Sequence, residues 1–251
     1  MTPILLALAA FAAPQAAPAP ASDQALSQRC LADVRADAEK AVATANDWRM
    51  RGGGWLARQC LGLAYSSLGR WEPAATAFDQ AAAEAEVKRD PHHADLLVQG
   101  GNSWLAAGDP VKARKDFDAA LALGSLANEL RGEVLLDRAR AGVMASDLPG
   151  ARIDIDKALA LVPADPFGWY LSAALARREG KLERAKTDIA KAVELGGDDA
   201  AVLLEAGNIA GVAGDVDAAK GLYARAIRAA PESEAAKSAQ AALTANAAPQ
   251  P

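Results

Sequence analysis

The stretch GDPVKARKDFDAALAL, Gly108–Leu123, carries the pattern that decides the fold. After its Gly-Asp turn, Ala113, Phe117 and Ala120 are spaced four and then three residues apart, which places them on one face of a helix. Two of the three are alanine. A buried face that keeps such small side chains is typical of a helix that another helix approaches closely. We therefore expect a helix here that packs tightly against a neighbour.

The same pattern returns four more times along the chain. Its first alanines are Ala74, Ala113, Ala151, Ala185 and Ala219, so the successive steps are 39, 38, 34 and 34 residues. The bulky residues between the two alanines are, in chain order, Phe78, Phe117, Ile155, Ile189 and Tyr223. A step that recurs in this range indicates an array of helical repeats.

Each repeat divides into two helices. In the fourth clear repeat, Asp165 and Pro166 have the character of an N-cap and a first helical residue, and Gly180 ends that helix. A second helix follows and ends at Gly196-Gly197. No segment has the alternating, β-branched pattern of a strand, so the sequence predicts an all-α fold. Helices of about three or four turns are marginal alone, so we expect stacking to stabilise them.

Two segments resemble the tetratricopeptide repeat family. They are Leu61-Gly62-x-x-Tyr65 followed by Ala74-x-x-x-Phe78, and Gly100-Gly101-x-x-Trp104 followed by Ala113-x-x-x-Phe117. The resemblance implies a right-handed α-α superhelical solenoid that binds proteins and needs no cofactor. We expect a signal peptide over 1–21, a degenerate helical unit over 22–54, five tetratricopeptide repeats over 55–231, and a capping helix with a disordered tail after Leu243 over 232–251.

The first residues predict export. The apolar run Ile4–Ala13 is too short to span a bilayer, and Ala19-Pro20-Ala21 has the small-x-small pattern of a cleavage site before Ser22. No Lys or Arg precedes the run, so an unprocessed leader is the alternative. We expect a periplasmic or secreted protein with no integral membrane span. Its net charge of -5, without a basic stripe, argues against nucleic acid as a partner.

Cys30 and Cys60 are the only two cysteines. In an exported chain an even count favours a disulfide. The alternative is a pair of buried free thiols that serve as small apolar residues.

The sequence offers no catalytic or metal site. His92 and His93 are the only histidines, and neighbouring residues on a helix point about 100° apart, so they make no ready chelate. A histidine-dependent nucleophile would need one of these two. We therefore expect neither an enzyme nor a metal protein.

The inner wall of the solenoid, lined by the first helices, is the predicted binding site. Phe167, Tyr170 and Arg177 share a helix face, which suits an extended segment with apolar and acidic side chains. The predicted groove residues are Asn102, Arg140, Phe167, Tyr170, Arg177 and Asn208. The alternative is that the two aromatic residues pack the helix entrance and that Arg177 is solvated.

The family resemblance gives the two asparagines their role. Asn102 and Asn208 match the asparagine with which peptide-binding members hold a ligand backbone, although both are also common repeat residues. Val98 and Leu204 stand where the lysines of the carboxylate clamp would be, which argues against recognition of a C-terminal carboxylate. We expect a non-enzymatic adaptor of the cell envelope that binds a protein segment. The alternative is a structural solenoid that self-assembles through its convex face or its ends.

Overall fold

The computed structural model describes residues 22–247; the predicted leader and the last four residues of the predicted tail lie outside this part. Within it, the chain forms thirteen α-helices and no strand. Their bounds are α1 Asp23–Ala36, α2 Ala38–Met50, α3 Gly54–Ser67, α4 Trp71–Lys88, α5 His93–Ala106, α6 Pro110–Ala122, α7 Asn128–Met144, α8 Leu148–Leu161, α9 Pro166–Arg178, α10 Leu182–Gly196, α11 Ala200–Val212, α12 Val216–Ala229 and α13 Glu234–Ala247.

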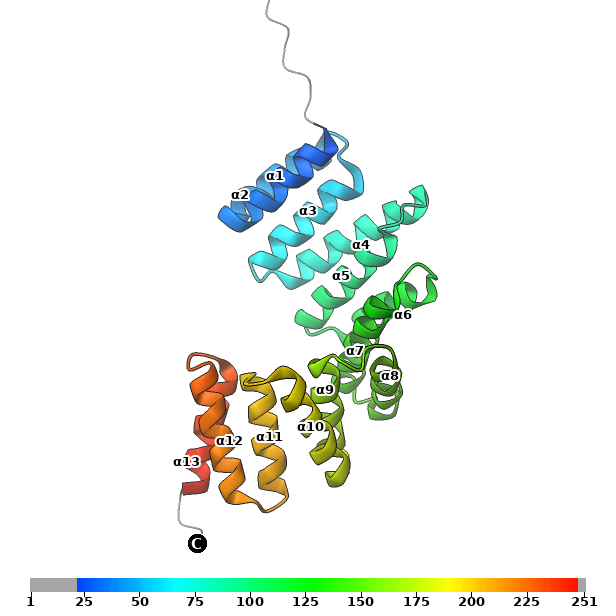
Figure 1. Ribbon diagram of the computed structural model, residues 1–251. Coiled ribbons are helices and arrows are strands. Elements are labelled where there is room, and N and C mark those ends of the chain that lie inside the picture. The colour runs from blue at the N-terminus through cyan, green and yellow to red at the C-terminus, as the bar shows by residue number, and fades with distance from the viewer. Residues whose placement is uncertain (1–21, 248–251) are drawn as a thin grey trace, which may run out of the picture.

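Each helix packs mainly against its neighbours in sequence, and the most extensive contacts are those of α9 with α10, α4 with α5, α3 with α4, α7 with α8 and α11 with α12. Figure 1 shows the helices in one continuous row that bends between α7 and α9, so that α1 and α13 end on the same side of the curve. The all-α fold and its solenoid form are therefore as predicted.

The repeated pattern lies in the core. All fifteen residues of the five alanine, bulky residue, alanine triplets are buried, with exposed fractions between 0% and 6%. Ala113, Phe117 and Ala120 are each 0% exposed. The small side chains thus stand where helices meet, as the sequence predicted.

In each repeat, the bulky residue of the triplet on the second helix faces a small residue on the first helix. A Cβ on Gly101 of α5 would lie 2.6 Å from the Phe117 ring of α6, closer than real side chains approach. Gly62 has the same relation to Phe78 and Gly207 to Tyr223. Where the bulky residue is instead isoleucine, the residue sixteen positions earlier is the buried Ala139 or Ala173. The size of the first-helix residue therefore compensates for the size of the second-helix residue.

Helix starts and lengths follow the sequence signals. The Asp109 carboxylate accepts a hydrogen bond from the Lys112 amide at 3.0 Å, and Asp165 accepts one from the Phe167 amide at 2.9 Å. Gly197 ends α10 with a φ of 61°. α4 has 18 residues and α7 has 17, so the longer steps between the early repeats come from longer helices.

The C-terminal helix is longer than predicted. α13 continues to Ala247, past Leu243, where the sequence predicted an unstructured tail to begin. The Thr244 hydroxyl donates to the Gln240 carbonyl at 2.9 Å, and alanine favours the helix, so this stretch carries the helix for one more turn. The buried Ala236 and Ala239 pack this helix onto the array.

Candidate functional site

Three of the predicted groove residues lie together on the wall formed by the first helices. The rings of Phe167 and Tyr170, both on α9, stack with their centroids 6.0 Å apart. The Arg140 guanidinium carbon reaches across from α7 to 5.9 Å from the Phe167 ring centroid. Phe167 is 40% exposed, so this cluster presents an aromatic and cationic surface and does not merely fill the helix entrance.

Arg177 and Asn208 belong to a different group. Arg177 Nε donates to Glu205 Oε1 at 2.6 Å, and its Nη2 donates to Glu205 Oε2 at 3.1 Å. Asn208 Nδ2 donates to the same carboxylate at 3.2 Å, and its Oδ1 accepts from the Tyr223 hydroxyl at 3.0 Å. These residues form a network that ties α9 to α11 and α12.

The network determines which side chains of the predicted wall carry a charge that is free to bind a partner. Hydrogen bonding to Glu205 raises the pKa of Arg177 further above its already high usual value. Burial, with the nearby Glu205 charge, raises the pKa of the Tyr170 hydroxyl, which therefore stays neutral at physiological pH. Arg177 is only partly solvated, with 30% of its side chain exposed, and it is paired with a buried carboxylate. Of the two arginines, Arg140 is the more open to a partner, with its side chain 45% exposed and paired only with Asp137 on its own helix.

Glu205 is the residue that sequence reasoning missed. It lies 28 positions after Arg177 and is buried, with its side chain 7% exposed. Its only signal in the sequence is a charged residue within the otherwise apolar start of α11, two positions before Gly207.

Asn102 takes part in neither the aromatic stack nor the Glu205 network. It is half-buried on α5, whereas the stacked rings are on α9. Leu105 of α5 and Leu136 of α7, both on first helices, are in the core, at 6% and 1% exposed. The accessible wall is therefore less continuous than the sequence predicted.

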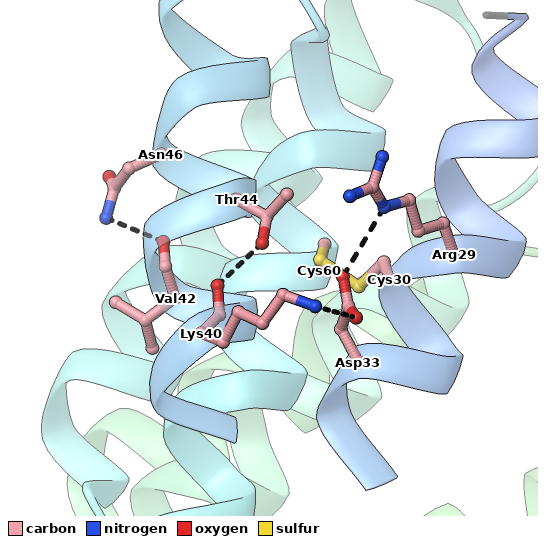
Figure 2. Close-up of a disulfide and its surroundings, with 8 residues drawn as sticks. All are labelled: Arg29, Cys30, Asp33, Lys40, Val42, Thr44, Asn46 and Cys60. Carbon is pink, nitrogen blue, oxygen red and sulfur yellow. Dashed lines mark hydrogen bonds and ion pairs between the residues drawn. A yellow bond between two sulfur atoms is a disulfide. The ribbon is translucent and has the colours of Figure 1, made fainter. Parts of the chain in front are cut away.

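Figure 2 shows the disulfide between Cys30 of α1 and Cys60 of α3, with the two Cα atoms 5.9 Å apart. Beside it the Asp33 carboxylate lies between two cations, 3.7 Å from Arg29 Nε and 3.2 Å from Lys40 Nζ. The disulfide joins the N-terminal helix pair to the first clear repeat, whereas the ion pair of Asp33 with Lys40 joins α1 to α2 within that pair.

The histidines and acidic residues form no metal centre in the part of the chain that the structure describes, since no three potential ligands gather there. His92 stacks on Trp55 with ring centroids 5.1 Å apart, and its Nδ1 lies 2.8 Å from Asp90 Oδ1. Among the helices of residues 22–247, none has the length and apolar character needed to cross a membrane.

Paired helices stacked in one bending row define an α-solenoid of the tetratricopeptide type, and solved structures share this fold. PilW, a type IV pilus biogenesis factor, superposes with a TM-score of 0.71 at 21% identity, covering 87% of this chain and 98% of its own. PilF of Pseudomonas aeruginosa gives 0.67 at 20% identity, covering 88% and 97%. A tetratricopeptide repeat protein of Thermus thermophilus gives 0.62 at 18% identity, covering 76% and 100%.

No protein-family model matches the sequence, and no curated protein matches it. The structural likeness therefore shows the tetratricopeptide fold, as the sequence resemblance predicted.

Proposed function

We propose that this protein is a non-enzymatic scaffold that binds an extended segment of another protein along the wall of its first helices. The observation that carries the proposal is the cluster of exposed Arg140 and Phe167 with the half-buried Tyr170. Aromatic and arginine side chains are the residue types that most often dominate binding energy at protein interfaces. Solenoids of this kind use such extended walls for recognition.

We place this function in the cell envelope. The leader pattern in residues 1–21 supports export, and a disulfide between Cys30 and Cys60 suits an oxidising compartment. PilW is described as a type IV pilus biogenesis factor, although it shares only the fold with this chain.

The rival function is self-assembly through the outer face. Large apolar side chains are exposed on the second helices, with Val87 of α4 84% exposed, Val111 of α6 73% and Ile153 of α8 54%. Contacts between copies at these residues would make the protein a structural element with an empty groove.

Affinity capture from envelope extract, followed by mass spectrometry, separates the two functions. Arg140→Ala/Phe167→Ala removes two exposed side chains of the cluster, and Val111→Ala/Ile153→Ala removes two from the outer face. We expect the first variant to lose at least about tenfold of the captured partner and the second to retain it, with unchanged circular dichroism for both. The proposal would be overturned if Arg140→Ala/Phe167→Ala kept the partner and Val111→Ala/Ile153→Ala lost it. It would also be overturned if light scattering showed that the molecular mass of the wild type, but not that of Val111→Ala/Ile153→Ala, increases with protein concentration.

A further inference from the structure

An apolar pocket of about 270 Å³ opens between α7 and α9. Its apolar lining includes Val143 and Met144 of α7 and Leu171 and Ala174 of α9, and Met144 is 49% exposed. Sites for small molecules usually enclose roughly 300–1,000 Å³. The pocket is therefore of a size to receive one or two side chains of a partner.

Two arginines flank this apolar surface, Arg140 from α7 and Arg178 from α9. Arg140 is already paired with Asp137 at 3.0 Å, whereas Arg178 is exposed and has no ion-pair partner in the part of the chain that the structure describes. The protein as a whole carries a net charge of -5, so the positive charge of Arg178 beside this pocket is a local exception. An acidic group that the rest of the surface repels would be attracted here.

We propose that this pocket anchors a partner segment in which an aliphatic side chain lies next to a carboxylate. The aliphatic side chain would enter between Met144 and Leu171, and the carboxylate would accept hydrogen bonds from Arg178. The inference rests on the proposed function and specifies its ligand.

The pocket continues into the aromatic cluster. Arg140 lines the pocket and also lies against the Phe167 ring, while Tyr170 precedes the pocket residue Leu171. A segment anchored in the pocket would therefore extend over the stacked rings, because successive residues of an extended chain advance by about 3.3 Å. This continuity favours a polypeptide over a free anion, for which the arginines alone would suffice.

The test uses a phage-displayed library of random twelve-residue peptides, selected on the full-length protein. We expect enriched peptides to share an aliphatic residue adjacent to Asp or Glu. The best peptide and its Asp→Asn or Glu→Gln version are then titrated by fluorescence anisotropy. Arg178→Ala should weaken the acidic peptide about tenfold and leave the amide version unchanged, because only the acidic peptide uses the guanidinium charge.

Two further variants complete the design. Met144→Glu places a negative charge at the exposed edge of the pocket, and we expect it to weaken the acidic peptide more than the amide peptide. Arg228→Ala, an exposed arginine on the distant α12, is the matched control and should change neither affinity. Thermal unfolding verifies that each variant remains folded.

The outcomes separate this inference from the proposed function. The peptides could bind more weakly to Arg140→Ala/Phe167→Ala, yet be affected equally by Arg178→Ala and Arg228→Ala. This result would support binding along the wall but overturn the proposal that the pocket anchors the segment. A consensus without an acidic position would overturn the pocket as well. Enrichment of no peptide would overturn both proposals.

Discussion

Arg177 and Glu205 form a two-point ion pair between α9 and α11, with N–O distances of 2.6 and 3.1 Å. The Glu205 side chain is 7% exposed and that of Arg177 30%. A carboxylate buried to this extent depends on its partner, because removal of one member leaves the other charge desolvated and unpaired. The pair therefore joins two successive repeats more strongly than a surface ion pair would.

We predict that Arg177→Ala lowers the free energy of unfolding by about 2–3 kcal/mol, somewhat less than for a fully buried pair because the arginine is partly solvated. Urea unfolding measures this change. The neighbouring Arg178→Ala is the control, and it should stay within about 0.5 kcal/mol of wild type. Equal losses for the two variants would show that the pair contributes little. Because Arg177→Ala also destabilises the protein, loss of partner binding in this variant is weak evidence that Arg177 contacts the partner directly.

The close approach of Gly101 to Phe117 gives a second prediction. Gly101→Ala should overpack the contact and destabilise the protein by about 1–3 kcal/mol, since the new Cβ would lie 2.6 Å from the ring. In α7 and α8 the matching pair is Ala139 and Ile155, both buried. Gly101→Ala/Phe117→Ile copies that combination.

A double-mutant cycle measured by thermal unfolding tests this compensation. We expect the double variant to be more stable than the sum of the two single changes predicts, by about 0.5–3 kcal/mol. Simple additivity would mean that the glycine is not required by the ring. Gly221→Ala, at an open position of α12, is the control for the intrinsic effect of alanine in a helix.

The repeats could be predicted because their signals are local. Spacings such as that from Ala113 to Phe117 lie within one helix, and caps such as Asp165 act on the next few residues. Contacts between helices carry no such period. Nothing in the helical pattern of α8 shows that Asp154 is 7% exposed and accepts hydrogen bonds from Arg138 of α7 at 2.8 and 2.7 Å.

The site shows the same limit. The sequence placed Phe167, Tyr170 and Arg140 on one wall because helical periodicity and the repeat step determine which face each residue occupies. It could not show that Arg177 pairs with Glu205, because that contact depends on the angle between successive repeats. The angle between repeats determines which charged side chains come within reach of one another, whereas the small and apolar core positions can be predicted from periodicity alone.

The disulfide that fastens the N-terminal helices should contribute to the free energy of unfolding. Because Cys30 and Cys60 are 30 residues apart, the bond should stabilise the protein by about 3–4 kcal/mol in the chain-entropy model. Cys30→Ser/Cys60→Ser should lose a similar amount in urea unfolding. Mass spectrometry of the protein, purified and alkylated without reductant, tests the bond itself. Two alkylated thiols per chain would contradict it.

Asp79 of α4 and Asp116 of α6 meet at Gly100 of α5. A Cβ on Gly100 would lie 2.7 Å from Asp79 Oδ1 and 3.2 Å from Asp116 Oδ2, and both oxygens are buried without a hydrogen-bond partner in the described structure. The other Asp79 oxygen accepts from Trp104 Nε1 at 3.0 Å. Two facing carboxylates of this kind share a proton more readily than they both ionise.

The pair predicts that this region loses stability as pH rises. Burial, together with the Asp79 charge, raises the pKa of Asp116 to about 7, and Lys115 on α6 only partly opposes this shift. The ordinary pKa of an unfolded Asp is about 3.9. The folded state therefore holds the extra proton between these values, so the stabilisation is complete below about pH 4 and is lost as pH rises through 7.

Asp116→Asn keeps a hydrogen-bond donor at every pH. We expect it to flatten this dependence and to be more stable than wild type at pH 8 by about 1–3 kcal/mol, the effect of pairing a buried polar group. Urea unfolding from pH 5 to 8 measures both proteins, with Asp217→Asn, an exposed position on α12, as the control. A pH profile for Asp116→Asn that parallels wild type would show that Asp116 is not the source of the pH dependence.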